Sequence, residues 1–276
     1  MRAIPVIAGL TFREAARKKL LWMALAAGAA FLTLFGIGLH YQAKDLAARS
    51  NAIIRGPALE SMLMVGLYAT DLLAVLMTVL TSVDTLSGEL ESNTLQALAA
   101  KPITRREILL GKWLGLAAML TVYVLLMTGG IALIANSIGG VRPRHFANGL
   151  GLIWLECLLM LSVTLLSGTF LSTLTNGVLA LGLHGHAFLG GWVEQAGAAL
   201  HSPRAVNVGI VASLIMPTES LWRRAAFQMQ SPLINALGFS PFSTLSVPSR
   251  ARIGYALVYW LVALLLALWR FSRLNF

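Results

Sequence analysis

Cysteine is almost absent from this chain: Cys157 is the one cysteine among 276 residues. An intramolecular disulfide is therefore excluded, and with it the class of small secreted scaffolds that disulfides hold together. Cys157 lies inside an apolar block, where a thiol is poorly activated as a nucleophile. Cysteine chemistry therefore does not favour an enzyme, and the redox compartment of the protein stays open.

Charge is also scarce. Asp, Glu, Lys and Arg make up 12% of the residues, whereas soluble domains carry roughly 25%, and 57% of this chain is hydrophobic with a mean hydropathy of +0.76. Acidic residues number 11 against 21 Lys and Arg, which leaves a net charge of +10. Because the basic residues are scattered at the ends of apolar blocks, contacts with lipid headgroups are favoured over nucleic-acid binding. This composition excludes an ordinary soluble domain and indicates a polytopic membrane protein.

A phosphate-binding loop is missing from the sequence. The pattern G-x-x-x-x-G-K-[S/T] can be aligned only on Gly111-Lys112, but Arg106 stands at the position of the first glycine and Trp113 follows the lysine. No cofactor is therefore expected in this chain, and ATP hydrolysis would belong to a separate polypeptide.

Six apolar blocks are long enough to cross a hydrocarbon core of about 30 Å. They lack the period-two alternation of barrel strands, so they predict helices. A helix is the other structure that pairs all its backbone hydrogen-bonding groups within lipid. The N-terminus lacks the pattern of a cleaved signal peptide, so the first block is expected to remain as a span. We predict an all-α integral membrane protein with one transmembrane domain over residues 1–276. The predicted spans are 21–39, 58–83, 113–135, 149–171, 177–199 and 254–270.

A short interfacial helix is predicted over residues 3–19, where apolar and basic residues recur at helical spacing. An even number of spans places both termini on the same side of the membrane. Basic residues directly before the first span and after the last one favour the cytoplasm for both termini. These residues are Arg13, Arg17, Lys18, Lys19, Arg270 and Arg273.

The segment 200–253 is predicted to lie on the outer face. Its apolar part is broken by Gly209 and Pro217, and a proline inside a spanning helix interrupts it. A surface or half-inserted helical hairpin is favoured, because irregular backbone at membrane depth must be buried in protein. A seventh span is the alternative.

The stretch TLQALAAKPITRREILLGKWLG, residues 94–115, concentrates charge between two apolar blocks. Thr104 and Glu107 fit the capping-box pattern S/T-x-x-E, which predicts a helix from residue 105 into the third span. Pro102 disfavours helix at Lys101, so a preceding helix is expected to end near residue 100.

Upstream of the proline, a separate short amphipathic helix is predicted within the segment 84–112. Ser87 can cap it, Glu89 and Glu91 suit its positive N-terminal end, and Lys101 suits its C-terminal end. Its apolar stripe is Leu90, Thr94, Leu95 and Leu98. The segment is either a well-capped loop with solvated charges or a docking element for a soluble partner.

The order and spacing of these motifs resemble the central region of ABC-2-type transporter permeases. In that family a GTL-type helix, a proline break, an (S/T)-R-R-E-type turn and G-K-x-x-G leading into the third span recur together. The resemblance runs from Glu89 to Gly115, with Asn93 where the family often has glycine. The basic interfacial helix resembles the family's elbow helix, and the ending ALWRFSRLNF is similar to its common tail, with Asn275 in place of aspartate.

The resemblance implies a permease subunit, an exporter, that dimerises with an identical or homologous permease. It further implies contact with two cytoplasmic ABC ATPase subunits, which bind ATP and Mg²⁺, and a place in the cell inner membrane among lipids. Coupling to the ATPase would run through residues 88–107. The residues expected to couple are Glu89, Glu91, Thr94, Leu95, Leu98, Lys101, Pro102, Thr104, Arg105, Arg106 and Glu107.

Charged side chains inside the predicted spans are costly and raise a functional hypothesis. Asp71, Glu156, His184 and Glu194 are candidates for a translocation path at the permease dimer interface. The alternative is structural hydrogen bonding between helices. A metal site is disfavoured, because His184 and His186 point about 200° apart on a helix. A nucleotide-independent carrier and a membrane scaffold remain rival functions, and the fold does not choose a substrate.

Overall fold

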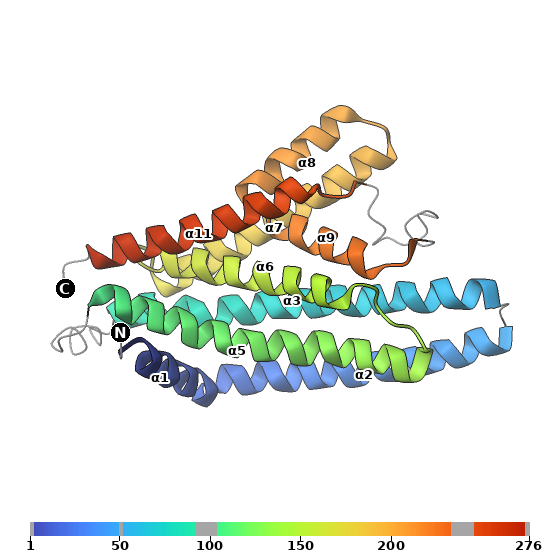
Figure 1. Cartoon of the computed structure of the whole chain (residues 1–276), viewed down its shortest axis with the longest axis horizontal. Helices are drawn as coiled ribbons and strands as arrows, with labels where there is room; N and C mark the ends of the chain where they lie inside the picture. Colours follow the sequence, from blue (N-terminus) through green and yellow to red (C-terminus); the bar gives the residue numbers. More distant parts are fainter. Residues whose placement is uncertain (1–2, 50–51, 92–103, 233–245, 274–276) are drawn as a thin grey trace.

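A computed structural model describes residues 3–49, 52–91, 104–232 and 246–273, and every regular element in these ranges is helical. The all-α class predicted from the sequence is confirmed. Figure 1 shows the arrangement. The helices are α1 (Ala3–Arg17), α2 (Lys19–Arg49), α3 (Ala52–Glu91), α5 (Arg105–Ile134), the π-helix η1 (Ala135–Gly139), α6 (Phe146–Ser167), α7 (Thr173–Ala199), α8 (Pro203–Ile215), α9 (Thr218–Met229) and α11 (Arg250–Ser272).

Long helices run up and down along one axis. In Figure 1, α2, α3 and α5 lie side by side, with α6 against α3 and α5 and with α11 packed on α6. Both chain termini lie at one end of this bundle, which we call the terminal end, and the opposite end is the distal end. The most apolar stretch of α6 is 78% buried, against 17% for α2 and α11, so α6 is central and the other two are peripheral.

Five of the described helices are long and apolar enough to cross a membrane: Lys19–Ala48, Ile54–Gly88, Arg105–Gly139, Phe146–Ser167 and Arg250–Ser272. They correspond to the first, second, third, fourth and sixth predicted spans. The fifth predicted span coincides with α7, which at 27 residues is long enough but is not among the five. The hydropathy of α7 is lowered by its polar residues, which include Asn176, His184, His186 and Glu194. The bent pair α8–α9 raises the number to six if it is counted as one broken span.

The prediction that a new helix begins at Ser87 is wrong. α3 continues without a break to Glu91, and Ser87 lies inside it. The Ser87 hydroxyl donates to the carbonyl oxygen of Val83, one turn back. A serine can satisfy its hydroxyl in this way within a helix as well as cap one, so the residue alone does not decide between the two.

The predicted interfacial helix is present as α1, and a bend at Lys18 separates it from α2. Its buried face packs on the start of α5 at Gly111 and Gly115. A Cβ built at Gly115 would lie 2.6 Å from the carbonyl oxygen of Ala8 and 3.2 Å from the amide of Phe12. Glycine is therefore required at this crossing, because larger residues would push the two backbones apart.

Pro217 interrupts the distal segment, as predicted. α8 ends at Ile215, α9 begins at Thr218, and their axes differ by 109°. α8 returns along α7, and α9 is buried against α6. The two helices therefore do not form one straight span, and the irregular backbone between them is covered by protein. The depth of this hairpin in the membrane and the side on which it lies stay predictions.

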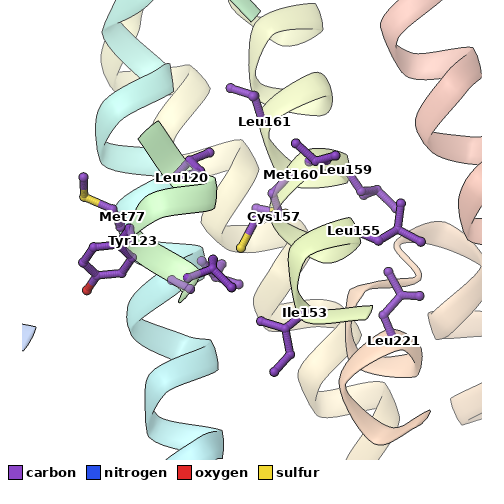
Figure 2. Close-up of a cluster of buried hydrophobic side chains, with 14 of the residues drawn as sticks. Met77, Leu120, Tyr123, Ile153, Leu155, Cys157, Leu159, Met160, Leu161 and Leu221 are labelled. Carbon is purple, nitrogen blue, oxygen red and sulfur yellow. The ribbon is translucent and has the colours of Figure 1, made fainter. Parts of the chain in front are cut away.

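The apolar core takes residues from most of the helices, including four that meet around the middle of the bundle. Figure 2 shows Met77 of α3, Tyr123 of α5, Cys157 of α6 and Leu221 of α9 gathered in one cluster. Cys157 is fully buried in it. The core thus fixes α9, with its polar residues, inside the bundle.

Candidate functional site

The start of α5 carries the predicted capping box. The backbone amide of Glu107 donates to the Thr104 hydroxyl at 3.4 Å, and the backbone amide of Thr104 donates to the Glu107 carboxylate at 3.1 Å. The capping box thus provides a partner for the Thr104 amide at the helix start, whereas the Glu107 amide also donates to the carbonyl oxygen of Thr104 at 3.0 Å. Arg105 and Arg106 follow in the first turn, and Arg106 is exposed. The basic start of α5 is therefore fixed in direction at the terminal end.

Most of the other predicted coupling residues cannot be placed in the same detail. Thr94, Leu95, Leu98, Lys101 and Pro102 lie outside the described residues. Glu89 and Glu91 belong to the last turn of α3. Their role in coupling stays a prediction.

Buried polar contacts join the start of α5 to its neighbours. The Lys112 ammonium donates to the carbonyl oxygen of Thr85 in α3 at 3.5 Å, and the Trp113 indole donates to the Ser162 hydroxyl in α6 at 3.0 Å. Lys112 is only 4% exposed, so this contact is made away from solvent. A movement of the start of α5 would therefore act directly on α3 and α6.

A second polar junction ties α7 to the same end. The Asn176 amide donates to the carbonyl oxygens of Thr164 at 3.0 Å and Val83 at 3.3 Å, and its oxygen accepts the Ser167 hydroxyl. Asn176 is fully buried. The sequence analysis missed this residue, although an asparagine one turn into an apolar helix is a polar residue that needs partners inside the bundle.

Three of the four predicted path residues converge near the middle of the bundle. Glu156 of α6 and His184 of α7 lie 3.9 Å apart between Oε1 and Nδ1, and Asp71 of α3 is within electrostatic range of Glu156. Glu156 is fully buried, and neither of its carboxylate oxygens has a hydrogen-bond partner among the described residues. These three residues form what we call the central acidic cluster.

α9 adds a residue that the sequence analysis did not select. Glu219, in the first turn of α9, is 7% exposed and also lies within electrostatic range of Glu156. From sequence, the segment around Glu219 was expected on the outer face. The bend at Pro217 buries Glu219 beside the central acidic cluster, while the side of the membrane on which the segment lies stays a prediction.

Glu194 belongs to a different, ion-paired cluster. Its carboxylate accepts the Arg223 guanidinium at 2.7 Å, Arg252 at 3.2 Å and the Ser246 hydroxyl at 2.6 Å. Glu194 is fully buried and Arg223 is 3% exposed. This ion-paired cluster joins α7, α9 and α11, so Glu194 has a structural task independent of any role in translocation.

The two histidines of α7 point to different surroundings. His184 faces the central acidic cluster, whereas His186 is exposed. Within the described ranges, no group of three or more His, Cys, Asp or Glu residues is arranged to hold a metal ion.

Comparisons with known proteins bear on the whole chain. A search of curated proteins gives no match. The family model described as "ABC-2 family transporter protein" matches residues 6–275, which is nearly the full length. The matched region includes the capped start of α5 and every helix of the bundle except the first residues of α1. On this evidence the chain belongs to the ABC-2 transporter family.

Proposed function

We propose that this membrane subunit works as one permease of a dimeric, ATP-driven exporter and is coupled through residues 88–107 to separate cytoplasmic ABC ATPase subunits. ATP and Mg²⁺ would be bound by those subunits, and the second permease would be an identical or homologous chain. The single observation that supports coupling most is the capped, basic start of α5, joined to α3 by Lys112 and to α6 by Trp113. Dimerisation and export follow from the family resemblance.

The physical argument for coupling concerns stiffness. A capped helix start transmits a push along its axis because its first turn does not fray. Lys112 and Trp113 lie less than three turns from Thr104 and make buried hydrogen bonds with α3 and α6. An ATPase that moves residues 104–107 would therefore move three helices together.

The proposed orientation places the terminal end in the cytoplasm and the chain in the cell inner membrane. Exposed basic residues border this end: Arg13, Arg17 and Lys19 around the junction of α1 and α2, and Arg270 near the end of α11. Positive residues close to spans favour the cytoplasmic side. Labelling of cysteines introduced at the two ends of α5 in intact cells tests this orientation.

Reversing both charges at the start of α5, Arg105→Glu with Arg106→Glu, is expected to weaken retention of the ATPase by about 30-fold, the effect of losing a contact worth about 2 kcal/mol. The measurement is co-purification of the partner ABC ATPase with the chain from membranes, with the amount of inserted permease as reference.

The matched control is Arg204→Glu with Arg250→Glu, an equal charge change on exposed arginines at the starts of α8 and α11. It should retain the ATPase as the wild type does. Equal retention by both double variants contradicts coupling through this region. Transport on an ion gradient with no ATPase present would instead identify a nucleotide-independent carrier.

We also propose that the central acidic cluster belongs to the translocation path. Glu156→Gln keeps the shape of the side chain, and no hydrogen bond to Glu156 is lost among the described residues. Thermal unfolding should therefore be unchanged, while ATP turnover of the reconstituted complex falls by about tenfold, within the usual range for coupling between linked sites. Unchanged turnover would leave Glu156 with a structural role alone.

A further inference from the structure

The seam between α5 and α6 is hollowed on the surface of the distal half. One hollow, of about 320 Å³, is lined by Gly129, Leu133 and Asn136 on one side and by Arg142 and Phe146 on the other. A second, of about 220 Å³, follows along the same seam. It is lined mainly by Thr121, Leu125, Leu150, Gly151 and Trp154.

The two hollows follow each other along the seam, and we call them together the seam groove. Leu125 and Gly129 are one helical turn apart on α5, and the residue after Phe146, Ala147, lines the second hollow. From Thr121 to Asn136 the groove follows α5 for about 22 Å at 1.5 Å per residue. This length is close to half of a bilayer of about 40–45 Å including its headgroups.

The seam groove is apolar along its length because its polar side chains are already paired. The Trp154 indole donates to the Thr121 hydroxyl at 2.8 Å. The Nε of Arg142 donates to the side-chain oxygen of Asn136 at 2.7 Å. An occupant of the groove therefore meets hydrocarbon surface up to its distal mouth.

Positive charge gathers at that mouth. Arg142 lines the groove, and Arg144 is exposed two residues later. Neither guanidinium has a carboxylate partner within 4.0 Å among the residues that the structure describes. Since Asn136 holds only the Nε of Arg142, the terminal nitrogens of that guanidinium remain at the mouth to bind an anion in the fork geometry that suits phosphate.

We propose that the seam groove binds an anionic phospholipid of the distal leaflet, with an acyl chain between α5 and α6 and its phosphate at Arg142 and Arg144. A soluble anion would leave the apolar length empty, and an apolar molecule without charge would leave the arginines unpaired. The lipid matches both parts, as well as the length of one leaflet. The site is independent of the proposed coupling to an ATPase.

Two glycines make the acyl part of the site testable. A Cβ built at Gly129 or Gly151 meets no atom within 4 Å, so a larger side chain fits there without disturbing the fold and fills the groove. Gly254, exposed on α11, is equally open and lies away from the groove. Gly254→Leu is therefore a matched control for Gly129→Leu and Gly151→Leu.

The experiment is native mass spectrometry of the full chain in detergent, titrated with phosphatidylglycerol or with phosphatidylcholine of the same acyl chains. Phosphatidylglycerol should bind one site per chain more tightly than phosphatidylcholine. Arg142→Gln with Arg144→Gln should weaken phosphatidylglycerol binding by about 25-fold, a factor of about five for each basic residue near an anionic lipid. Gly129→Leu and Gly151→Leu should weaken both lipids.

The controls Arg204→Gln with Arg250→Gln, and Gly254→Leu, should bind as the wild type does. Equal binding by all variants overturns the proposal and leaves annular lipid contacts alone. A loss in the arginine variant only, with inorganic phosphate competing fully, also overturns it and indicates a site for a soluble anion. Melting temperatures of the variants separate loss of the site from loss of the fold.

Discussion

Arg223→Met is expected to lower the free energy of unfolding by about 3–5 kcal/mol, because it leaves a buried carboxylate without its shortest ion pair. Glu194 is fully enclosed and lies 2.7 Å from the Arg223 guanidinium. Arg252, the other arginine that pairs with Glu194, is 3.2 Å away and its side chain is 19% exposed, so it compensates only in part. Thermal unfolding of the purified chain in detergent measures the change.

The neighbouring Arg224 provides the control. Its guanidinium donates to the backbone oxygen of Pro248 at 3.2 Å and lies over the Phe227 ring, with no buried carboxylate as a partner among the described residues. Arg224→Met should therefore cost clearly less. Glu194→Gln combined with Arg223→Met should recover part of the loss, since both charges are then removed from the interior. A double variant no more stable than Arg223→Met alone would contradict the role given to this pair.

Gly115→Leu is expected to separate α1 from α5. The atoms nearest to an added Cβ include the carbonyl oxygen of Ala8 at 2.6 Å and the Thr11 Cβ at 2.9 Å, which cannot move without moving the helix. Overpacking of this kind costs about 1–3 kcal/mol, and separation of α1 is the simplest way to relieve it.

Thr11→Cys reports the separation by its reaction with a maleimide. Thr11 is 7% exposed and the native Cys157 is fully buried, so the intact bundle should label slowly. Labelling should rise when Gly115→Leu is added. Gly9→Leu is the control on the same helix, because a Cβ at Gly9 meets nothing within 4 Å. Continued protection of the cysteine in the Gly115→Leu background would show that α1 stays docked.

The fold was predictable where a local signal decides the structure. Long apolar blocks determine the helices α2, α3, α5, α6 and α11, and Thr104 with Glu107 determines where α5 begins. Ser87 was misjudged because a serine satisfies its hydroxyl equally well at a helix start or inside a helix. The continuation of α3 to Glu91 instead accompanies contacts with distant residues, such as the hydrogen bond from Thr173 to Ser87.

The sequence identified most residues of the candidate site but not which of them contact one another. Charged side chains within an apolar helix can be recognised from sequence as candidates, because charge at membrane depth is costly. These residues are Asp71, Glu156, His184 and Glu194. Their division into a central acidic cluster and an ion-paired cluster depends on α9, which the bend at Pro217 inserts among α3, α6 and α7. The position of α9 in the bundle does not show in the spacing of apolar residues along the sequence. Glu219 and Arg223 could therefore not be assigned to these clusters from sequence.

The buried position of α9 also sets an order of events during biosynthesis. α9 carries Glu219, Arg223 and Arg224 in 12 residues, so it is too polar to partition into lipid by itself. Arg252, which completes the pairing of Glu194, is translated after α9. Glu194 therefore gains its second arginine partner only when α11 has been made, and we expect chains that are truncated before residue 252 and released from the ribosome to leave α9 more open to protease than the full chain does.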